Sequence, residues 1–146
     1  MEYRKFGSSY VVRLDCGEEV VESLTALCRQ ENIRLGSING LGAVNDVTLG
    51  AFNHDQFLFE SVRYTGTLEM ASCVGNISTK DGEVYLHLHA TVGNPVNQEC
   101  HGGHLSRAVI SLTGEFILQS LEGEVEREYS PEIGLNLFRF TDAGNE

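Results

Sequence analysis

The sequence predicts an α+β fold, in which a single compact domain packs one main N-terminal helix on a largely antiparallel β-sheet. Apolar residues recur at helical spacing in only one long stretch, near the N-terminus. Short apolar or alternating runs fill the rest of the chain. Turn sequences typical of hairpins, such as Lys80-Asp81-Gly82, separate several of these runs. An early helix followed by many closely spaced strands indicates the α+β class.

Length and composition are those of one globular domain. The chain has 146 residues, of which 41% are hydrophobic and 21% charged, and both values are ordinary for such a domain. A chain of this size buries roughly two thirds of the surface that it exposes when unfolded. No linker, repeat or low-complexity segment interrupts it. We expect one domain over residues 1–146, with its core between about residues 6 and 139.

The predicted helix begins with a capping-box pattern. Asp15 takes the N-cap position, and Glu18 stands three residues later at the reciprocal position. Helical spacing then continues for about 15 residues, as far as the neighbourhood of Asn32. The apolar stripe consists of Val20, Val21, Leu24, Leu27 and Cys28. We expect this stripe to cover one face of the sheet.

The remaining elements are predicted as strands. They comprise residues 8–14, 44–52, 57–64, 66–77, 84–92, 104–121, 124–129 and 135–140, followed by a frayed tail at 141–146. Gly36, Gly40 and Gly42 precede the second strand. They do not make a dinucleotide-binding fingerprint, because Asn45 stands where the third glycine is required. We expect these glycines to allow a bulge or a close crossing of backbones.

Three histidines have a spacing that metal chemistry explains. His87 and His89 are two residues apart in a strand-like run, so both side chains share one face, with Cα atoms about 6.7 Å apart. The chain then turns, and a hairpin would return His104 to the same neighbourhood. Three neutral imidazoles with a fourth position open are the ligands of catalytic zinc sites. The sequence therefore predicts that His87, His89 and His104 bind zinc or another divalent transition metal, one ion per subunit.

Two alternatives accompany this prediction. Histidines on the polar face of a strand can simply be solvated, as we expect for His54 in its turn. His101 and Cys100 lie close enough in the sequence to replace one of the three ligands. We rank His104 above His101 because a glycine pair allows a tight turn immediately before it. Alternation along residues 104–121 predicts that His104 lies at the mouth of the core.

The charge balance argues against nucleic acid as a partner. Ten basic and 21 acidic residues give a net charge of −11 at pH 7. Proteins that bind nucleic acid cluster Lys and Arg to displace counterions from phosphates, and here the basic residues are scattered. An acidic surface raises the local concentration of cations instead. The sequence therefore favours metal binding and makes DNA binding doubtful.

The cysteines and the termini indicate the compartment. The four cysteines are widely scattered and form no Cys-x-x-Cys pair, so we expect free thiols. The N-terminus lacks the apolar segment of a signal peptide. No stretch approaches the roughly 18 apolar residues of a membrane span. We expect a cytoplasmic protein with no membrane partner.

The chain resembles the plant and prokaryote conserved (PPC) domain family, in its stand-alone prokaryotic form. The matching segments are RLDCGEEVVESL (13–24), SINGLGAVNDVTLG (37–50), GTLEMASCVGNIS (66–78), YLHLHA (85–90) and GGHL (102–105). The resemblance implies one helix on an antiparallel sheet and assembly as a homotrimer. Prokaryotic members often carry a DNA-binding label derived from plant relatives with AT-hook segments. No such Arg-Gly-Arg-Pro hook occurs here.

The three histidines are also similar in order and spacing to the zinc ligands of acetolactate decarboxylase, which shares the broad fold. That likeness raises the alternative of a metal-dependent lyase or hydrolase acting on a small carbonyl or carboxylate ligand. Glu69 is then a candidate acid–base group, with an exposed strand carboxylate as its simpler interpretation. Arg107 is a candidate carboxylate clamp, although its parity differs from that of His104. We therefore carry three hypotheses: a metal-binding PPC-domain protein of unassigned role, such an enzyme, and a DNA-binding regulator.

Overall fold

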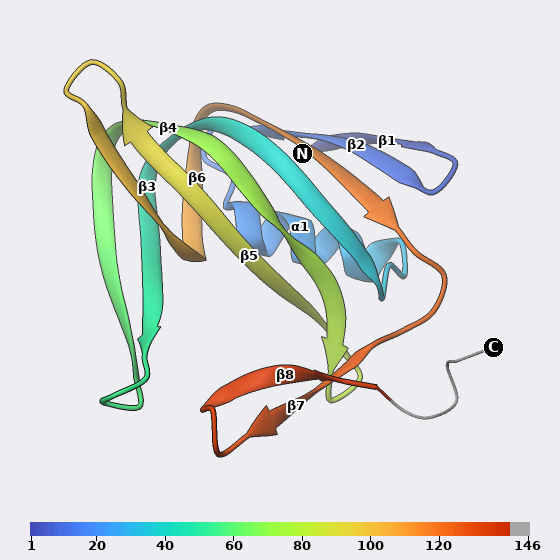
Figure 1. Ribbon diagram of the computed structural model, residues 1–146. Coiled ribbons are helices and arrows are strands. Elements are labelled where there is room, and N and C mark those ends of the chain that lie inside the picture. Colours follow the sequence, from blue (N-terminus) through green and yellow to red (C-terminus); the bar gives the residue numbers. More distant parts are fainter. Residues whose placement is uncertain (141–146) are drawn as a thin grey trace.

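The computed structural model describes residues 1–140, which form strands and a single helix (Figure 1). In chain order the elements are β1 (Glu2–Phe6), β2 (Ser9–Asp15), α1 (Val20–Gln30), β3 (Gly36–Asn53), β4 (Leu58–Lys80), β5 (Glu83–Asn94), β6 (Glu99–Ser120), β7 (Glu126–Ser130) and β8 (Leu135–Arg139). The single domain, the largely antiparallel sheet and the one helix are as predicted. The α+β class fits only loosely, because α1 has 11 residues and most of the chain is strand.

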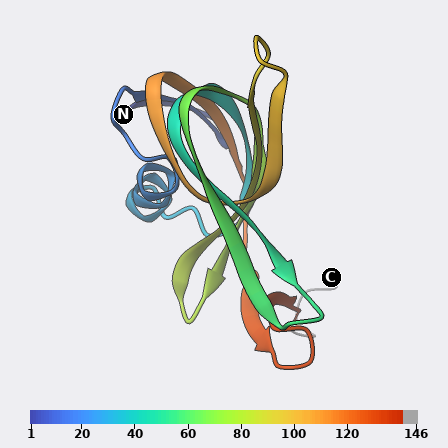
Figure 2. The same cartoon turned by 90° about the vertical axis from the view of Figure 1, so that its left-hand side faces the viewer.

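The four long strands pair in a closed circuit. β3 pairs with β4 and β6, and β5 also pairs with β4 and β6, in every case antiparallel. The strands accordingly curl around a common interior, which is visible when the molecule is viewed from the side (Figure 2). β2 pairs with the C-terminal part of β6, on the edge opposite to β3, and β1 pairs with β2. β7 joins β4 by one parallel pair, Thr79 with Glu126, and forms a hairpin with β8.

The helix begins later than the capping box predicted. Asp15 and Glu18 do pair, since the Asp15 N–H donates to the Glu18 carboxylate at 2.7 Å, but they close a turn that precedes the helix. The N-cap is Glu19, whose carboxylate accepts from the N–H of Glu22 at 2.7 Å. The chain turns at residues 16 and 17 and then bridges to β6 through Gly17, Glu18 and Glu19, so the helix begins only at Val20. α1 is neither long nor apolar enough to cross a membrane.

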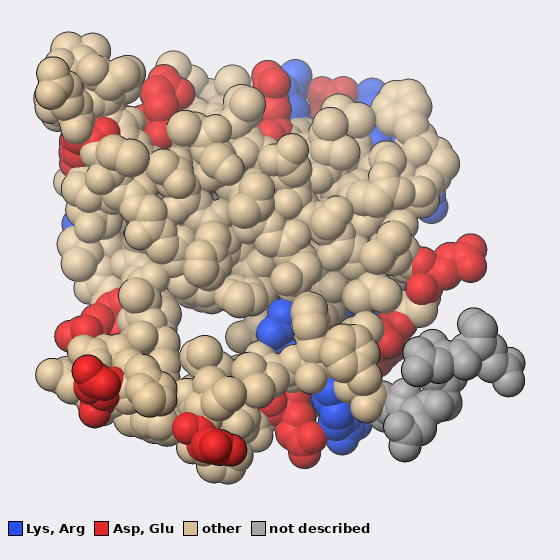
Figure 3. Space-filling view, in the orientation of Figure 1, with Lys and Arg blue, Asp and Glu red and all other residues tan. Residues whose placement is uncertain are grey.

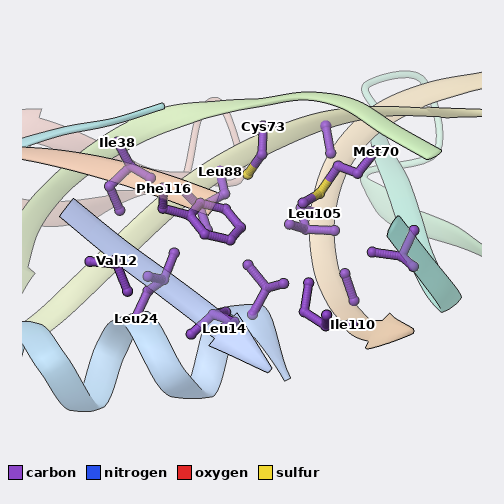
Figure 4. Close-up of a cluster of buried hydrophobic side chains, with 14 of the residues drawn as sticks. Val12, Leu14, Leu24, Ile38, Met70, Cys73, Leu88, Leu105, Ile110 and Phe116 are labelled. Atoms are coloured by element: carbon purple, nitrogen blue, oxygen red, sulfur yellow. The ribbon is translucent and has the colours of Figure 1, made fainter. Parts of the chain in front are cut away.

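The core lies between α1 and the inner faces of the strands (Figure 4). Leu24 and Leu27 of the helix are fully buried, and so are Leu88 of β5 and Phe116 of β6. Full burial of such a side chain stabilises the fold by about 1.5–3 kcal/mol. The predicted stripe therefore does cover a sheet.

The glycines of β3 allow close approach, as predicted. A Cβ at Gly40 would lie 2.1 Å from the Phe116 ring, and one at Gly42 would lie 2.6 Å from the Thr113 carbonyl oxygen. The pairing of β3 with β4 shifts register between Gly40 and Gly42. Gly36 is part of the same strand, which begins earlier than residue 44.

Two further differences concern the strand boundaries. The runs 57–64 and 66–77 form one continuous strand, β4, which passes through Gly66 at a φ of +123°. β1 was missed, because its residues are mostly exposed and show no apolar alternation. The strands predicted at 124–129 and 135–140 are present as β7 and β8. The frayed tail predicted at 141–146 lies outside the described residues.

Candidate metal centre

β5 carries two histidines on the face that points away from the core. Leu88 and Ala90 are buried, whereas His87 is half-buried and His89 exposed. This alternation is the ordinary period of a strand, so the inner residues hold β5 against the core while the two imidazoles share the outer face. Asn76 of β4 is the cross-strand neighbour of His87, and Val74 is that of His89.

The β5–β6 hairpin returns the third histidine to the same face. The chain turns between residues 95 and 98, and His104 then stands directly opposite His89 in the pairing of β5 with β6. Directly paired residues in neighbouring strands share a face and bring their side chains within contact distance. The structure therefore gathers His87, His89 and His104, as the predicted hairpin requires.

The prediction that His104 lies at the mouth of the core was wrong, because β6 contains a bulge. Thr48 of β3 pairs with Arg107, but the next residue of β3, Leu49, pairs with Leu105, so Ser106 has no partner in this ladder. Such an extra residue reverses the alternation on one side of the bulge. Leu105 consequently faces the core, and His104 faces outward.

The three rings fit a single divalent ion. One ring nitrogen from each residue lies within 4.8 Å of the others. Ring centroids are 5.2 Å apart for His87 and His89, 5.3 Å for His87 and His104, and 5.6 Å for His89 and His104. These nearly equal distances place one point about 3.1 Å from every centroid, and an imidazole that binds zinc at about 2.0–2.1 Å has its centroid roughly 3.2 Å from the ion. Small ring rotations would bring the nitrogens to bonding distance.

The surroundings of two of these imidazoles lower their pKa values. Burial lowers the pKa of His87, and the positive charges of Arg127, His104 and His89 lower it further. Burial also lowers the pKa of His104, with His89 adding to the effect. A metal ion requires the unprotonated imidazole, so both shifts favour binding near neutral pH.

The alternative ligands lie elsewhere. His101 pairs with the buried Val92, and therefore belongs to the opposite face from His104. Its ring stacks on Tyr64 with centroids 3.9 Å apart, and its Nε2 lies 2.8 Å from a Glu99 carboxylate oxygen. Cys100 is exposed and outside the cluster. His54 lies in its turn with an exposed side chain, as expected.

The glycine pair before His104 acts differently from the expected tight turn. Gly102 and Gly103 lie inside β6, and neither has a positive φ. A Cβ at Gly103 would lie 2.7 Å from the carbonyl oxygen of Gly50 on β3, whereas one at Gly102 would meet nothing closer than 3.7 Å. Gly103 therefore lets β3 approach β6 closely beside His104.

A pocket of about 670 Å³ opens beside the cluster. The three histidines form one side of it, and residues of the β3–β4 and β7–β8 hairpins form the others. Figure 3 shows the hollow between these two hairpins. Arg127 of β7 lines the pocket and is 7% exposed. Arg127 was not among the residues predicted from the sequence, where its one signal is a lone positive charge within an acidic segment.

The two auxiliary residues proposed from the sequence do not reach the pocket. Glu69 is an exposed carboxylate on β4, which agrees with the simpler of its two interpretations, and it does not line the pocket. Arg107 donates to the Asp46 carboxylate at 2.7 Å, on which Arg63 also converges. Arg107 is therefore part of a surface ion-pair network and not a clamp at the histidines.

The chain belongs to the Plants and Prokaryotes Conserved (PCC) domain family, the family abbreviated PPC above. Its family model matches residues 1–122. The match therefore contains the three histidines and ends before the β7–β8 hairpin. The comparison with curated proteins gives no match.

Several solved structures share the fold over nearly the whole chain. A Bacteroides thetaiotaomicron protein named "putative DNA binding protein" is 36% identical, with a TM-score of 0.91, and the alignment covers 95% of this chain and 96% of that one. A metal-containing protein from Archaeoglobus fulgidus is 27% identical, with a TM-score of 0.85 and coverage of 95% and 97%. A PPC protein from Pyrococcus horikoshii is 28% identical, with a TM-score of 0.83 and coverage of 97% and 96%.

Proposed function

We propose that this protein binds a divalent transition-metal ion, zinc in the first instance, through His87, His89 and His104, one ion per chain. The observation that carries the proposal is the convergence of three outward-facing imidazoles on one point, from β5 and β6. The family relative from Archaeoglobus is described as metal-containing, which supports the same conclusion. Three imidazoles also accept copper, nickel or iron, so the identity of the ion is part of the test.

The direct test is metal analysis of protein purified without a histidine tag. We expect close to one equivalent of metal per chain after reconstitution at about pH 7.5, where the imidazoles are unprotonated. His89→Ala should fall below about 0.2 equivalents, because two imidazoles alone hold the ion weakly. A wild-type content below that same level would refute the site.

His101→Ala is the matched control. It removes an imidazole from the same hairpin, but one that stacks on Tyr64 on the opposite face. We therefore expect it to bind as much metal as the wild type. Loss of metal from this variant as well would place the ion elsewhere.

A second candidate function is a metal-dependent lyase or hydrolase that acts on a small carbonyl or carboxylate compound. The pocket beside the cluster favours it, because a ligand could reach the open position of the ion. When bound, the ion would polarise a carbonyl or lower the pKa of a bound water. No Asp or Glu is among the described residues that line the pocket, so an acid–base group would have to come from the substrate or from another chain. Metal-dependent turnover of 2-oxo or 2-hydroxy acids that disappears in His89→Ala would establish this function.

DNA binding is the weakest of the three hypotheses. The name of the Bacteroides relative suggests it, but this chain carries a net charge of −11. Binding to phosphates requires clustered basic residues, and Arg63 and Arg107 here are both paired with Asp46. A gel-shift titration at about 150 mM salt should give no complex. A complex that persists at this salt would restore the hypothesis.

Assembly as a homotrimer remains part of the proposal. Val11, Ile117 and Val74 are apolar and about half exposed. They belong to one row of cross-strand neighbours that runs from β2 through β6 and β3 to β4. The middle of the face in Figure 3 carries no charged side chains. Sedimentation analysis tests the assembly, and Val74→Glu should weaken it if this row is the interface.

A further inference from the structure

Arg127 is a buried positive charge that has no carboxylate partner among residues 1–140. Its Nε–H donates to Ser78 Oγ at 2.7 Å, and its two terminal nitrogens donate to the Asn136 carbonyl oxygen and to Asn76 Oδ1, both at 2.8 Å. All three acceptors are neutral. Burying an ion without an opposite charge is costly, so this arrangement indicates that an anion completes it.

The guanidinium also has donors to spare. The guanidinium has five N–H groups, one on Nε and two on each terminal nitrogen. The three hydrogen bonds use one N–H of each nitrogen. One N–H therefore remains on each terminal nitrogen, and a carboxylate accepts two N–H groups at once. The aromatic rings of Tyr85 and Phe138 hold the guanidinium in place, with its central carbon 4.9 Å and 4.2 Å from their centroids.

The position of Arg127 relates it to the histidines. Its acceptors Ser78 and Asn76 are the cross-strand neighbours of Tyr85 and His87. Arg127 therefore lies within about one strand repeat, roughly 7 Å, of His87 along the ladder. Both line the same pocket, whose other walls include the apolar residues Phe59 and Leu137.

We propose that this pocket binds a small organic acid, with its carboxylate on Arg127 and its apolar body toward the three histidines. Only the end of the ligand that points toward the histidines depends on the proposed metal site. The contact of the carboxylate with Arg127 does not depend on the ion. A carboxylate fits better than a phosphate, because one guanidinium is the only Lys or Arg side chain among the described residues that line the pocket. Part of the binding wall, the β7–β8 hairpin, lies beyond residues 1–122 that match the family model, so the family match by itself does not imply this ligand.

The test compares benzoate with benzamide, two probes of equal size of which only the first is charged, by calorimetric titration of the full-length protein. We expect benzoate to bind at least about tenfold more tightly than benzamide, as charge-assisted hydrogen bonds imply. Inorganic phosphate should bind more weakly than benzoate. Equal binding of benzoate and benzamide, or tighter binding of phosphate, would overturn the assignment without any substitution.

Arg127→Met should weaken benzoate by at least about tenfold and leave benzamide nearly unchanged, while Arg127→Lys should retain part of the preference for benzoate. Arg107→Met is the matched control, because Arg107 is an arginine outside the pocket, and it should bind benzoate as the wild type does. Thermal unfolding of every variant shows whether the β7–β8 hairpin has simply detached. Identical benzoate affinity in Arg127→Met and Arg107→Met would refute the inference.

Metal content, measured on the same samples, separates this inference from the proposed function. If the wild type takes up no metal, the proposed function fails, and the titrations on metal-free protein still decide the role of Arg127. A preference for benzoate that depends on Arg127 supports the inference in either metal state. Absence of that preference refutes it even when one equivalent of metal is bound.

Discussion

The adjacent glycines before His104 make a sharp test of how the fold holds the site. In Gly103→Ala, the new methyl group would lie 2.7 Å from the carbonyl oxygen of Gly50. An ordinary contact requires about 3.4 Å or more, so β3 and β6 must separate locally by about 0.7 Å. In Gly102→Ala the nearest atoms are 3.7 Å away, so nothing has to move.

The expected magnitudes follow from this displacement. Overpacking of this kind costs about 1–3 kcal/mol, and the lower backbone entropy of alanine in the unfolded chain offsets about 0.5–1 kcal/mol of it. We expect a net loss of up to about 2.5 kcal/mol for Gly103→Ala, and a neutral or slightly stabilising change for Gly102→Ala. His104 follows Gly103 directly, and a binding site tolerates displacements of only about 0.5 Å. Zinc affinity should therefore fall by about tenfold or more in the first variant only.

Two measurements check this prediction. Denaturant unfolding of the metal-free proteins gives the change in the free energy of unfolding, and competition with a chromophoric chelator gives the zinc affinity. If Gly103→Ala equals Gly102→Ala in both, the close approach of Gly50 does not position His104, and the reasoning fails. A loss of stability without a loss of affinity would show that the site accommodates the shift.

Three further predictions follow. The pKa values of His87 and His104 are lowered in the folded protein, so below about pH 6.5 the unfolded chain binds more protons than the folded one. The stability from these two groups is therefore present above that pH and lost as the pH falls. Between about pH 7.5 and 5.5, urea unfolding of the metal-free wild type should show a larger loss of unfolding free energy than unfolding of a His87→Gln/His104→Gln variant. Glu19→Ala removes the helix cap and the acceptor of the Ala108 N–H, which should cost about 1–3 kcal/mol in denaturant unfolding, whereas the exposed Glu22→Ala should cost little. Burial raises the pKa of the Cys28 and Cys73 thiols to about 12, whereas Cys16 and Cys100 are exposed. A thiol reagent at about pH 8 should therefore modify Cys16 and Cys100 quickly, and Cys28 and Cys73 only after unfolding.

The three histidines could be predicted from the sequence because each depends on local signals. The period of two places His87 and His89 on one face, and a hairpin turn returns the chain opposite them. The orientation of His104 could not be derived in the same way. It depends on the bulge at Ser106, where register is set by pairing with β3, a strand some fifty residues away in sequence. No residue type near Ser106 signals a bulge.

Arg127 shows the other limit of sequence reasoning. β7 contacts the main sheet through one parallel pair, through the hydrogen bonds of Arg127 and through the Glu126 carboxylate, which accepts from Thr79. Such a placement is a tertiary arrangement, and a local pattern predicts only that the acidic segment forms a strand. Arg107 was the arginine proposed from the sequence as a carboxylate clamp, although its parity differs from that of His104. A surface carboxylate, Asp46, was sufficient to bind it.

The side chains of β5 alternate between a face that packs against the core and a face that carries the histidines. Leu88 and Ala90 are buried against the core, whereas His87 and His89 face away from it. Substitutions on the outer face therefore leave the packing that holds the strand unchanged, and the closed circuit of strands keeps β5 and β6 in fixed register. For the same reason the outer face can accept new chemistry, and the β7–β8 hairpin adds an arginine there without altering the core. The three histidines therefore lie within the residues that match the family model, whereas Arg127 lies on a small hairpin beyond them.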